Sequence, residues 1–353
     1  MNAISKHRPR DYQVEGVYDA LRHNRRLLIS PTASGKSLMI YSLVRYYVEK
    51  KQNILIVVPT TSLVEQMYKD FADYGWDVGS YCHKIYAGKE RETDSQVIIT
   101  TWQSIYKLDK RYFSQFGTVF VDECHLAKAK SLTGIMTKLH DCKYRIGTTG
   151  TLDGSEIHQL VLEGLFAECQ QVTTTSELVK KKHLSPLHIK CLVLEHIKTH
   201  RRERTYQEEM EFLSTHRARN LFISKLVSTL EGNTLVLAQY IEKQLVPLSF
   251  KIVEKCEGRS IHLIHGATPT EDREKARELV EKENDAIIVA SYGVFSMGIN
   301  IKRLHNIIFG SPYKSQVKVL QSIGRGLRLA DDKTECNLSV SYTHLTLPTK
   351  RIV

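Results

Sequence analysis

Gly35, Lys36 and Ser37 stand in the run SPTASGKS, between an apolar run at residues 27–29 and a segment with apolar residues at three- and four-residue intervals. A strand, a loop of small residues and a helix form the context of a phosphate-binding loop, because a helix N-terminus holds phosphate oxygens through unpaired N–H groups. Lys36 would reach the β- and γ-phosphates, and the Ser37 hydroxyl can ligate Mg²⁺. The usual pattern opens with Gly where this chain has Ser30, so a plain strand–turn–helix stays open as an alternative. The residues expected to bind ATP here are Thr32, Ala33, Ser34, Gly35, Lys36 and Ser37.

Two carboxylates, Asp122 and Glu123, follow the apolar run at residues 119–121. Hydrolysis of ATP requires a metal ion, a polarised water and cations for the charge that develops on the γ-phosphate. Asp122 is the expected Mg²⁺ ligand together with Ser37, and Glu123 can orient or deprotonate the water. An isolated Asp-Glu pair is commonplace. One that ends an apolar strand after a phosphate loop indicates a catalytic pair.

Arg325 and Arg328 are three residues apart on a predicted helix, so we expect them to share a face with Gln321. A trans-acting arginine contributes roughly 10³ to 10⁵ in rate to phosphoryl transfer. The alternative is two surface arginines in a basic protein. If the arginines come from a second domain, hydrolysis requires the two domains to close.

Upstream of the phosphate loop, Arg10 and Gln13 precede a helical pattern. A Gln amide can read both the donor and the acceptor edge of adenine, and an Arg side chain can stack on the ring. Alone, the segment reads as a basic arm leading into a helix. Its position before the phosphate loop favours adenine recognition.

Short apolar runs alternate with helical patterns along the whole chain, which predicts βαβ units and mostly parallel sheets with helices on both faces. Each half of the chain would form one such α/β domain, and ligands in such sheets bind beyond the carboxyl ends of the strands. We expect helices at residues 219–230 and 271–282, and part of 176–182. Strands are expected at residues 27–29, 54–58, 97–99, 119–121, 144–146, 189–194, 234–238, 261–264, 286–290 and 306–309.

The chain length of 353 residues suits about two domains. We expect an N-terminal ATP-binding domain at residues 1–172, a linker at 173–187 and a C-terminal domain at 188–339. The formal charge of +11 favours a polyanionic partner such as nucleic acid, although a merely basic protein fits as well.

The seven cysteines are widely scattered, which argues for reduced thiols rather than disulfides or a zinc cluster. No apolar run has membrane-spanning length and the N-terminus lacks a signal-peptide core. We therefore expect a cytoplasmic, monomeric protein that does not contact membranes.

Together these stretches resemble the motifs of a superfamily-2 helicase core of DExH type, and they occur in that family's order. The resemblance implies two RecA-like domains and ATP-driven movement along nucleic acid. The matching runs are RDYQ (10–13), SPTASGKS (30–37), VVPTTSLVEQ (57–66), TTWQS (100–104), DECH (122–125), GTTGT (147–151), ASYGVFSMGINI (290–301) and QSIGRGLR (321–328).

Within that superfamily, the runs RPRDYQ, DECHLA, TYQEE and VLQSIGRGLR are similar to those of the UvsW recombination helicases of T-even-like phages. This resemblance implies action on branched DNA in recombination and repair, by fork reversal, junction migration and R-loop unwinding. It also implies that His125 and Thr149 couple the nucleotide to the nucleic acid, and that Gly298 lies at the nucleotide. The residues implied at the nucleic-acid backbone are Thr60, Thr61, Thr101, Trp102, Gln103 and Ser291.

Two features depart from the family pattern. Family members carry a substrate-recognition domain ahead of the core, whereas this chain starts almost at RDYQ. The run at residues 340–353 resembles nothing in the family, and we expect it to be a non-native tail. Three alternatives remain: the motor of a restriction system, an RNA helicase, and a nucleic-acid-binding protein with impaired turnover. Against the RNA helicases of DEAD type, motif II has Cys124 and His125 where they carry Ala and Asp.

Overall fold

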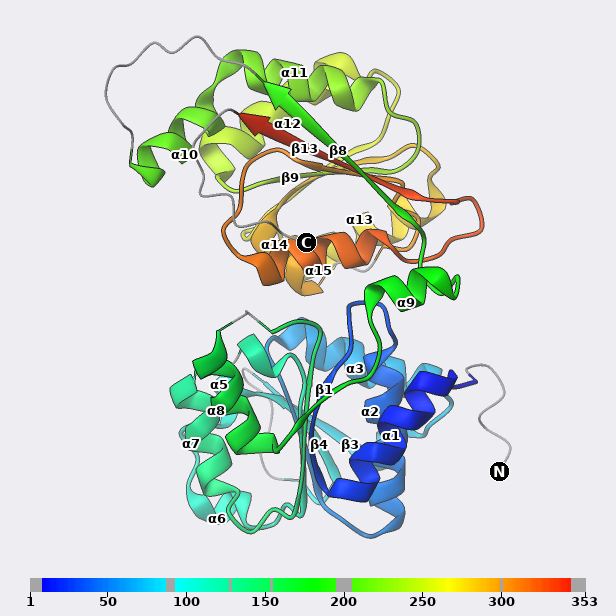
Figure 1. Ribbon diagram of the computed structural model, residues 1–353, viewed down its shortest axis with the longest axis vertical. Coiled ribbons are helices and arrows are strands. Elements are labelled where there is room, and N and C mark those ends of the chain that lie inside the picture. The colour runs from blue at the N-terminus through cyan, green and yellow to red at the C-terminus, as the bar shows by residue number, and fades with distance from the viewer. Residues whose placement is uncertain are drawn as a thin grey trace. The chain divides into compact units, whose positions relative to one another are not determined.

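The computed structural model describes residues 8–86, 93–126, 129–152, 155–194, 205–298 and 301–343. The chain divides into two compact units, unit 1 at residues 1–180 and unit 2 at 181–353 (Figure 1). The predicted α/β class is confirmed in each unit. None of the described helices is both long and apolar enough to cross a membrane.

Unit 1 is built on a seven-stranded sheet with the order β3-β4-β2-β5-β6-β1-β7, and every pairing among its described strands is parallel. The strands are β1 (Arg25–Ile29), β2 (Ile54–Val58), β3 (Cys82–Ile85), β4 (Val97–Thr101), β5 (Thr118–Val121), β6 (Tyr144–Thr149) and β7 (Cys169–Gln171). The helices are α1 (Asp11–His23), α2 (Lys36–Glu49), α3 (Thr61–Asp73), α4 (Val78–Tyr81), α5 (Trp102–Ile105), α6 (Lys110–Phe113), α7 (Ala129–Lys138), α8 (Glu156–Phe166) and α9 (Thr175–Lys180), with a 3₁₀ turn η1 (Cys124–Leu126).

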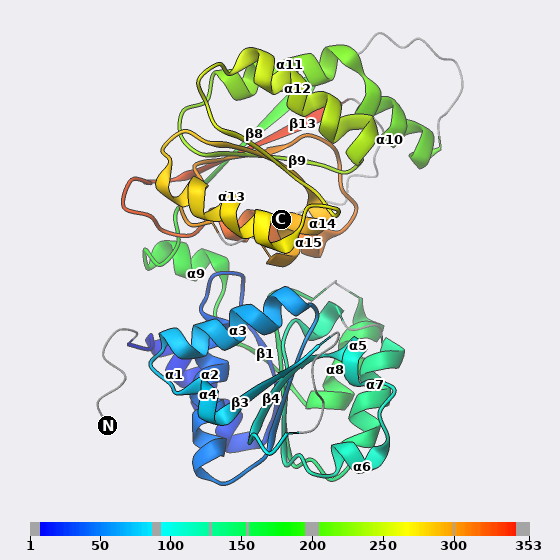
Figure 2. The same cartoon turned by 180° about the vertical axis from the view of Figure 1, so that it is seen from behind.

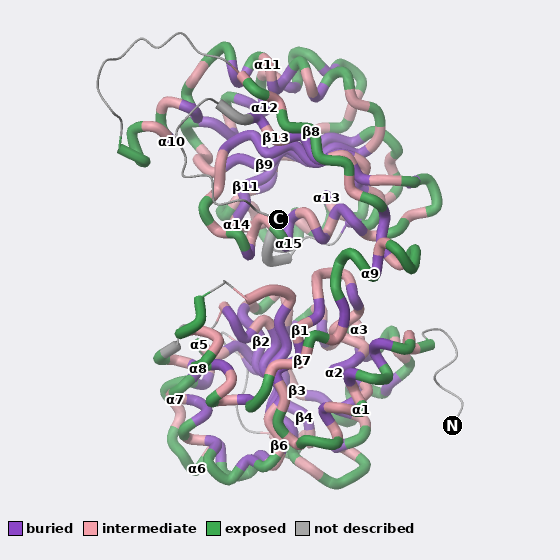
Figure 3. Tube along the Cα trace, viewed as in Figure 1, coloured by how far each residue is buried: buried purple, intermediate pink, exposed green. Residues whose placement is uncertain are grey.

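Both faces of the unit 1 sheet are covered by helices, and alternate residues of a strand enter opposite cores. Ile54, Ile56 and Val58 of β2 pack with α1, α2 and α3 on one face. Leu55 and Val57 pack with α7 and α8 on the other face. This two-residue alternation places every side chain of β2 in a core, so the strand is apolar throughout and wholly buried (Figure 3).

Unit 2 has a six-stranded sheet with the order β10-β11-β9-β12-β13-β8, and again every pairing among the described strands is parallel. Helices α11 and α12 cover one face, and α13, α14 and α15 lie on the other (Figure 2). The strands are β8 (Leu187–Leu194), β9 (Thr234–Ala238), β10 (Ile261–Ile264), β11 (Ile287–Ser291), β12 (Asn306–Phe309) and β13 (Cys336–Thr343). The helices are α10 (Tyr206–Thr215), α11 (Arg217–Ser228), the π-helical turn η2 (Ile241–Leu245), α12 (Val246–Lys255), α13 (Thr270–Lys282), α14 (Tyr292–Gly298) and α15 (Gln316–Gly326).

The ten predicted strands and the predicted helices are confirmed. Four strands have the predicted bounds, β2, β9, β10 and β12, and the other elements differ at one or both ends by one to three residues. Three strands were not predicted: β3, β7 and β13. The segment expected to be a linker contains α9 and ends at the start of β8. The C-terminal boundary expected at residue 339 falls inside β13, which stays paired with β8 as far as Thr343. Residues 344–353 lie outside the described part, and the non-native origin of 340–353 stays a prediction.

Candidate functional site

The loop between β1 and α2 has the backbone conformation of an anion cradle. Ala33 and Gly35 have φ values of 67° and 82°, and alternation of left- and right-handed residues turns successive N–H groups toward one point. The loop is held in this form by buried serines, since Ser30 Oγ donates to Ser34 Oγ at 2.7 Å and Ser30 N donates to Thr149 O at 2.9 Å. Ser30, which stands where the usual motif has Gly, therefore braces the loop.

Lys36 extends from the first turn of α2 toward the end of β5. Its Nζ donates to Ser30 O at 3.2 Å and lies 3.4 Å from Glu123 Oε1. Gly150 is close on another side, because a Cβ built on it would lie 3.4 Å from Lys36 Nζ and 3.7 Å from Thr32 N. The phosphate loop, the acidic pair and the GTTGT run thus meet around one ammonium group.

Asp122 lies directly after β5 and is buried. Its Oδ1 accepts hydrogen bonds from Thr148 Oγ1 at 2.7 Å and from Glu123 N at 2.9 Å. Burial raises the pKa of Asp122 to about 6, and the neighbouring charge of Glu123 adds to the effect, while Lys36 and the hydrogen bonds oppose it. Because burial makes this carboxylate costly to ionise, a cation bound beside it would stabilise its charged form strongly.

Glu123 has φ +47°, the left-handed region that side chains other than Gly rarely adopt. Burial disfavours its charged form, but Lys36, His125 and the backbone N–H of Gly150 outweigh burial and lower the pKa of Glu123. The side chain is thus kept ionised beside a carboxyl whose pKa is raised. Environments that push two neighbouring carboxyl pKa values apart are typical of catalytic pairs.

His125, in the turn η1, is buried and joins the acidic pair to β6. Its Nδ1 lies 2.6 Å from Thr149 Oγ1 and 3.4 Å from Glu123 Oε2. The Thr149 hydroxyl donates to Thr151 O at 3.0 Å, so its oxygen can accept from His125 when Nδ1 carries the proton. The two residues predicted to couple nucleotide and nucleic acid are therefore in direct contact.

The expected Mg²⁺ ligands come from two elements: Ser37 from α2 and Asp122 from the end of β5. Ser37 Oγ lies 2.8 Å from Tyr74 Oη, and burial raises the pKa of Tyr74 to about 12, so the phenol stays protonated at neutral pH. Among the described residues no group of three or more His, Cys, Asp or Glu could hold a metal ion by itself. A site formed by one hydroxyl, one carboxylate and phosphate oxygens is typical of Mg²⁺ bound with a nucleotide.

Gln13 of α1 lies against the phosphate loop. Its Nε2 donates to Ser34 O at 2.9 Å and to Gly35 O at 3.3 Å, and its Oε1 accepts from Arg10 N at 2.8 Å. Tyr12 adds a bond from its hydroxyl to Ser34 O at 2.7 Å. These contacts show that the RDYQ run braces the loop. Adenine recognition by Arg10 and Gln13 stays a prediction.

The unit 1 residues predicted to contact nucleic acid lie at the carboxyl ends of β2 and β4. These strands are neighbours in the sheet, since Val58 of β2 pairs with Thr101 of β4. Gln103 is exposed and its Nε2 donates to Pro59 O at 3.4 Å, which brings the two segments together. Thr60 caps α3 and Thr61 is exposed, whereas Thr101 is buried with its hydroxyl 2.9 Å from Ser104 Oγ. Trp102 is half-buried against the core. A contact through Thr101 could use only its backbone.

In unit 2, Ser291 ends β11 and is buried, and Gly298 is the last residue of α14. Ile299 and Asn300 of the same motif lie outside the described residues. Gln321 is buried within α15, and the guanidinium carbon of Arg325 lies 6.0 Å from the centre of the Phe295 ring.

The prediction that Arg325 and Arg328 share one helix face is wrong. α15 ends at Gly326, and Arg328 lies beyond its C-terminal cap, Leu327. Gly326 is packed against β12 and β13 so closely that a Cβ there would lie 2.5 Å from Ile307 Cδ1. The chain therefore leaves the helix at a residue that is a poor helix former and needs no side-chain space.

Three contact residues were missed by the sequence interpretation: Thr148, Gly150 and Tyr74. Thr148 and Gly150 belong to the GTTGT run, whose position after an apolar strand was a usable signal. Tyr74 follows α3, and its distance in sequence from Ser37 gave no signal.

Comparison with known proteins adds to this geometry. The family described as "Type III restriction enzyme, res subunit" matches residues 6–154, and "Helicase conserved C-terminal domain" matches residues 218–330. The "ATP-dependent DNA helicase uvsW" of Enterobacteria phage T4 is 36% identical over 337 residues, which are 92% of this chain and 66% of that protein. The chain belongs to the superfamily-2 helicases. It spans about two thirds of the length of that phage relative.

Two solved structures share the fold. A fragment of a putative HsdR subunit of a type I restriction enzyme from Vibrio vulnificus is 16% identical, with a TM-score of 0.72, and the match covers 94% of this chain and 64% of that one. The Dbp5 protein of S. cerevisiae, bound to RNA and ADP BeF3, is 15% identical with a TM-score of 0.68, over 97% of this chain and 85% of that one. Both neighbours are less than 25% identical to this chain, so they show the fold alone.

Proposed function

We propose that the protein is an ATP-driven DNA motor in which unit 1 binds and hydrolyses Mg²⁺·ATP. The observation that carries the proposal is that three motifs meet around the ammonium group of Lys36. Lys36 Nζ lies 3.4 Å from Glu123 Oε1, and Thr148 Oγ1 donates to Asp122 Oδ1 at 2.7 Å. This is the set of parts that phosphoryl transfer requires: a phosphate cradle, a metal carboxylate and a base.

The residues present fit Mg²⁺·ATP. The left-handed residues Ala33 and Gly35 shape an anion cradle. Glu123 Oε2 is a buried carboxylate oxygen that makes no hydrogen bond of normal geometry among the described residues and lies 3.4 Å from His125 Nδ1. Asp122 and Ser37 would hold Mg²⁺, which neutralises charge on the phosphates. Lys36 would exchange its contact with Glu123 for a phosphate oxygen, leaving Glu123 to orient the attacking water.

Unit 2 would supply the cations that complete the reaction. Arg325 and Arg328 would bind the charge that develops on the γ-phosphate, and Gln321 would help to position them. Ser291 would contact the nucleic-acid backbone, and Gly298 the nucleotide. Hydroxyl and backbone N–H groups suit sequence-independent phosphate contact, which is also the role proposed for Thr60, Thr61, Thr101, Trp102 and Gln103. Under this proposal, hydrolysis and grip on the strand depend on the same pair of domains.

For the nucleic acid we propose branched DNA, on the basis of the resemblance to the phage T4 protein named as a DNA helicase. Fork reversal, junction migration and R-loop unwinding are the corresponding activities, in recombination and repair. The net charge of +11 supports a polyanionic partner. We further propose that the protein acts as a monomer in the cytoplasm of the host cell. The restriction-type and RNA-bound fold neighbours keep the motor of a restriction system and an RNA helicase as second candidates.

The decisive experiment measures ATP hydrolysis without nucleic acid and then with single-stranded, duplex and forked DNA and with RNA. We expect DNA to raise kcat, and forked DNA to raise it most. Stimulation by RNA alone would favour the RNA helicase. ATP binding without hydrolysis under any condition would favour a nucleic-acid-binding protein with impaired turnover.

A further inference from the structure

The segment that carries Arg328 is held by groups outside the motif. We call residues 327–333 the arginine turn. It begins at the end of α15 and closes with a bridge between Ala330 and Lys333. A side chain on such a turn is only as well placed as the backbone beneath it, so the contacts of that backbone decide where Arg328 lies.

Lys333 is a buried cation directed at this backbone. Its side chain is 6% exposed, and its Nζ donates to the carbonyl oxygens of Gly326 and Arg328, the second at 2.9 Å. Burial lowers the pKa of Lys333. An ammonium group at a helix C-terminus satisfies carbonyls that have no partner inside the helix and interacts favourably with the helix dipole. Lys333 thus ties the last residue of α15 to Arg328.

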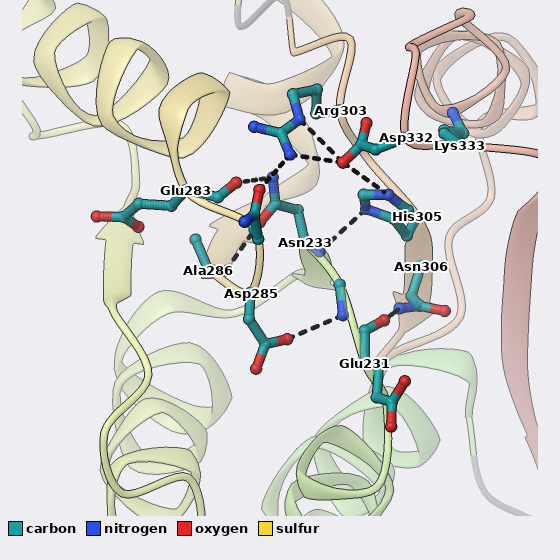
Figure 4. A network of polar contacts seen from close by, with 12 residues as sticks. Glu231, Asn233, Glu283, Asp285, Ala286, Arg303, His305, Asn306, Asp332 and Lys333 are labelled. Carbon is teal, nitrogen blue, oxygen red and sulfur yellow. Dashed lines mark hydrogen bonds and ion pairs between the residues drawn. The ribbon is translucent and has the colours of Figure 1, made fainter.

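The far end of the turn is anchored to the sheet (Figure 4). Asp332 accepts from Arg303 Nε at 3.0 Å and lies 3.5 Å from His305 Nε2. His305 Nδ1 in turn accepts from the backbone N–H of Asn233 at 3.1 Å, directly before β9. Because Asp332 adjoins Lys333, the network fixes the residue from which the ammonium group extends.

The segment that leads into β8 makes a second set of hydrogen bonds to the backbone of the arginine turn. Ser185 is buried; its N donates to Leu327 O at 2.7 Å and its Oγ donates to Arg328 O at 3.3 Å. Ser185 belongs to residues 181–186, which join α9 to β8. The carbonyl of Arg328 therefore accepts from two side chains, Lys333 within the turn and Ser185 in the segment before β8.

We infer that Lys333 and Ser185 are positioning residues for Arg328, which clamp the arginine turn so that the guanidinium group is preorganised for phosphoryl transfer. The inference rests on the proposed function, because it requires Arg328 to act in hydrolysis. Neither residue belongs to the helicase motifs of the sequence. Displacement of a catalytic group by about 1 Å can cost roughly 100-fold in rate, so a clamp of two side chains has a measurable effect.

The test compares the full chain with Lys333→Met, Ser185→Ala, Arg328→Ala and the double variant Lys333→Met/Arg328→Ala. Lys282→Met, an exposed lysine at the end of α13, is the matched control. We expect Lys333→Met to lower the DNA-stimulated kcat by about 10- to 100-fold with unchanged KM for ATP and unchanged DNA affinity. Ser185→Ala should lower kcat less, since its backbone bond to Leu327 remains.

The double variant separates positioning from general stabilisation. If Lys333 acts through Arg328, adding Lys333→Met to Arg328→Ala should have no further effect on kcat. Additive losses, or a normal kcat in Lys333→Met, would overturn the inference. If Lys333→Met does not fold, a normal kcat in Ser185→Ala overturns it and a reduced kcat supports it. A wild-type kcat in Arg328→Ala, or a wild-type protein that does not hydrolyse ATP, would instead refute the proposed function.

Discussion

The sheets of units 1 and 2 have the same strand order but carry different groups at the carboxyl ends of their strands. The strands β1 to β6 of unit 1 correspond in sequence order to β8 to β13 of unit 2, and corresponding strands occupy the same places in the two sheets. Unit 1 has one additional strand, β7, at one edge. β5 and β12 are therefore equivalent strands. β5 is followed by Asp122 and Glu123, whereas β12 is followed by Gly310 and Ser311.

The groups after β12 are neutral and engaged in internal hydrogen bonds. Gly310 O accepts from Arg219 Nη1 at 2.6 Å and from Gln244 Nε2 at 2.8 Å. Ser311 Oγ accepts from the backbone of Gln239 and Ser311 O accepts from the Tyr292 hydroxyl. The buried cation beside β12, Arg219, therefore binds carbonyl and hydroxyl oxygens, while Lys36 of unit 1 lies against a carboxylate. The two sheets thus have the same topology, and the side chains at the carboxyl ends of their strands determine which sheet can bind a charged ligand there.

Lys36→Ala tests the charged edge most severely. Loss of the ammonium group removes the cation for the β- and γ-phosphates, so we expect ATP hydrolysis to fall by at least about 10³-fold. Lys50→Ala, at the exposed end of the same helix, is the control and should hydrolyse ATP normally. Steady-state ATPase assays at saturating DNA provide the measurement, and substantial turnover by Lys36→Ala would contradict the assignment.

Glu123→Gln should have the next largest effect. The amide keeps the shape of the side chain but cannot accept a proton, so we expect kcat to fall by about 10² to 10⁴ while ATP binding persists. Equilibrium binding of a fluorescent ATP analogue, measured beside the ATPase rate, separates the two steps. Hydrolysis at the wild-type rate would remove Glu123 from the role of base.

Thr149→Val tests the contact between the acidic pair and β6. The variant preserves shape but loses the 2.6 Å contact with His125 Nδ1. We expect the stimulation of ATPase by DNA to fall by up to about 10-fold, the upper range for the loss of one hydrogen bond, and the basal rate to fall less. Equal loss of basal and stimulated rates would show a structural role instead of coupling.

The smallest expected effect is a change in the thermal midpoint when a carboxylate is neutralised, and its sign should differ between a variant in unit 1 and one in unit 2. The pKa of Asp122 is raised from 3.8 to about 6, so its contribution to stability is present below pH 3.8 and is lost as the pH rises through about 6. At pH 7.5 the carboxylate is ionised at a cost, and Asp122→Asn should raise the thermal midpoint by a few degrees. Asparagine Oδ1 can still accept from Thr148.

Asp332 in unit 2 is the opposite case. Its hydrogen bond from Arg303 lowers the pKa of Asp332, so its stabilising contribution is present above pH 3.8 and is lost as the pH falls further. Asp332→Asn should therefore lower the thermal midpoint at pH 7.5. Calorimetry of both variants at pH 7.5 checks the pair, and shifts of the same sign would contradict the opposite signs assigned to these two carboxylates.

The sequence predicted the strands that have apolar runs, such as β2 and β9, with the observed bounds. It missed β3 and β7 because both lie at sheet edges, where a strand needs no continuous apolar run. β13 was missed for a different reason. It lies inside the sheet, yet Ser339 and Ser341 are buried in it, so its pattern is not that of an interior strand.

Lys36, Asp122 and Glu123 could be predicted because each follows or begins an element with a clear pattern. The partners that hold them could not. Thr148 and Gly150 reach the site only because β6 lies between β5 and β1 in the sheet, and strand order is not encoded in any local run. The end of α15 before Arg328 depends in the same way on packing of Gly326 against Ile307.

The left-handed backbone of Glu123 stores conformational energy of about 1–3 kcal/mol at the proposed catalytic base. Two neighbouring groups, Lys36 and His125, hold its carboxylate while the backbone stays in that form. If Lys36 exchanged its contact with Glu123 for a phosphate oxygen, as proposed, the carboxylate would lose one of these two contacts. Binding of the nucleotide would thereby remove one contact of the Glu123 carboxylate, so that the proposed base gains freedom to move when its substrate is bound.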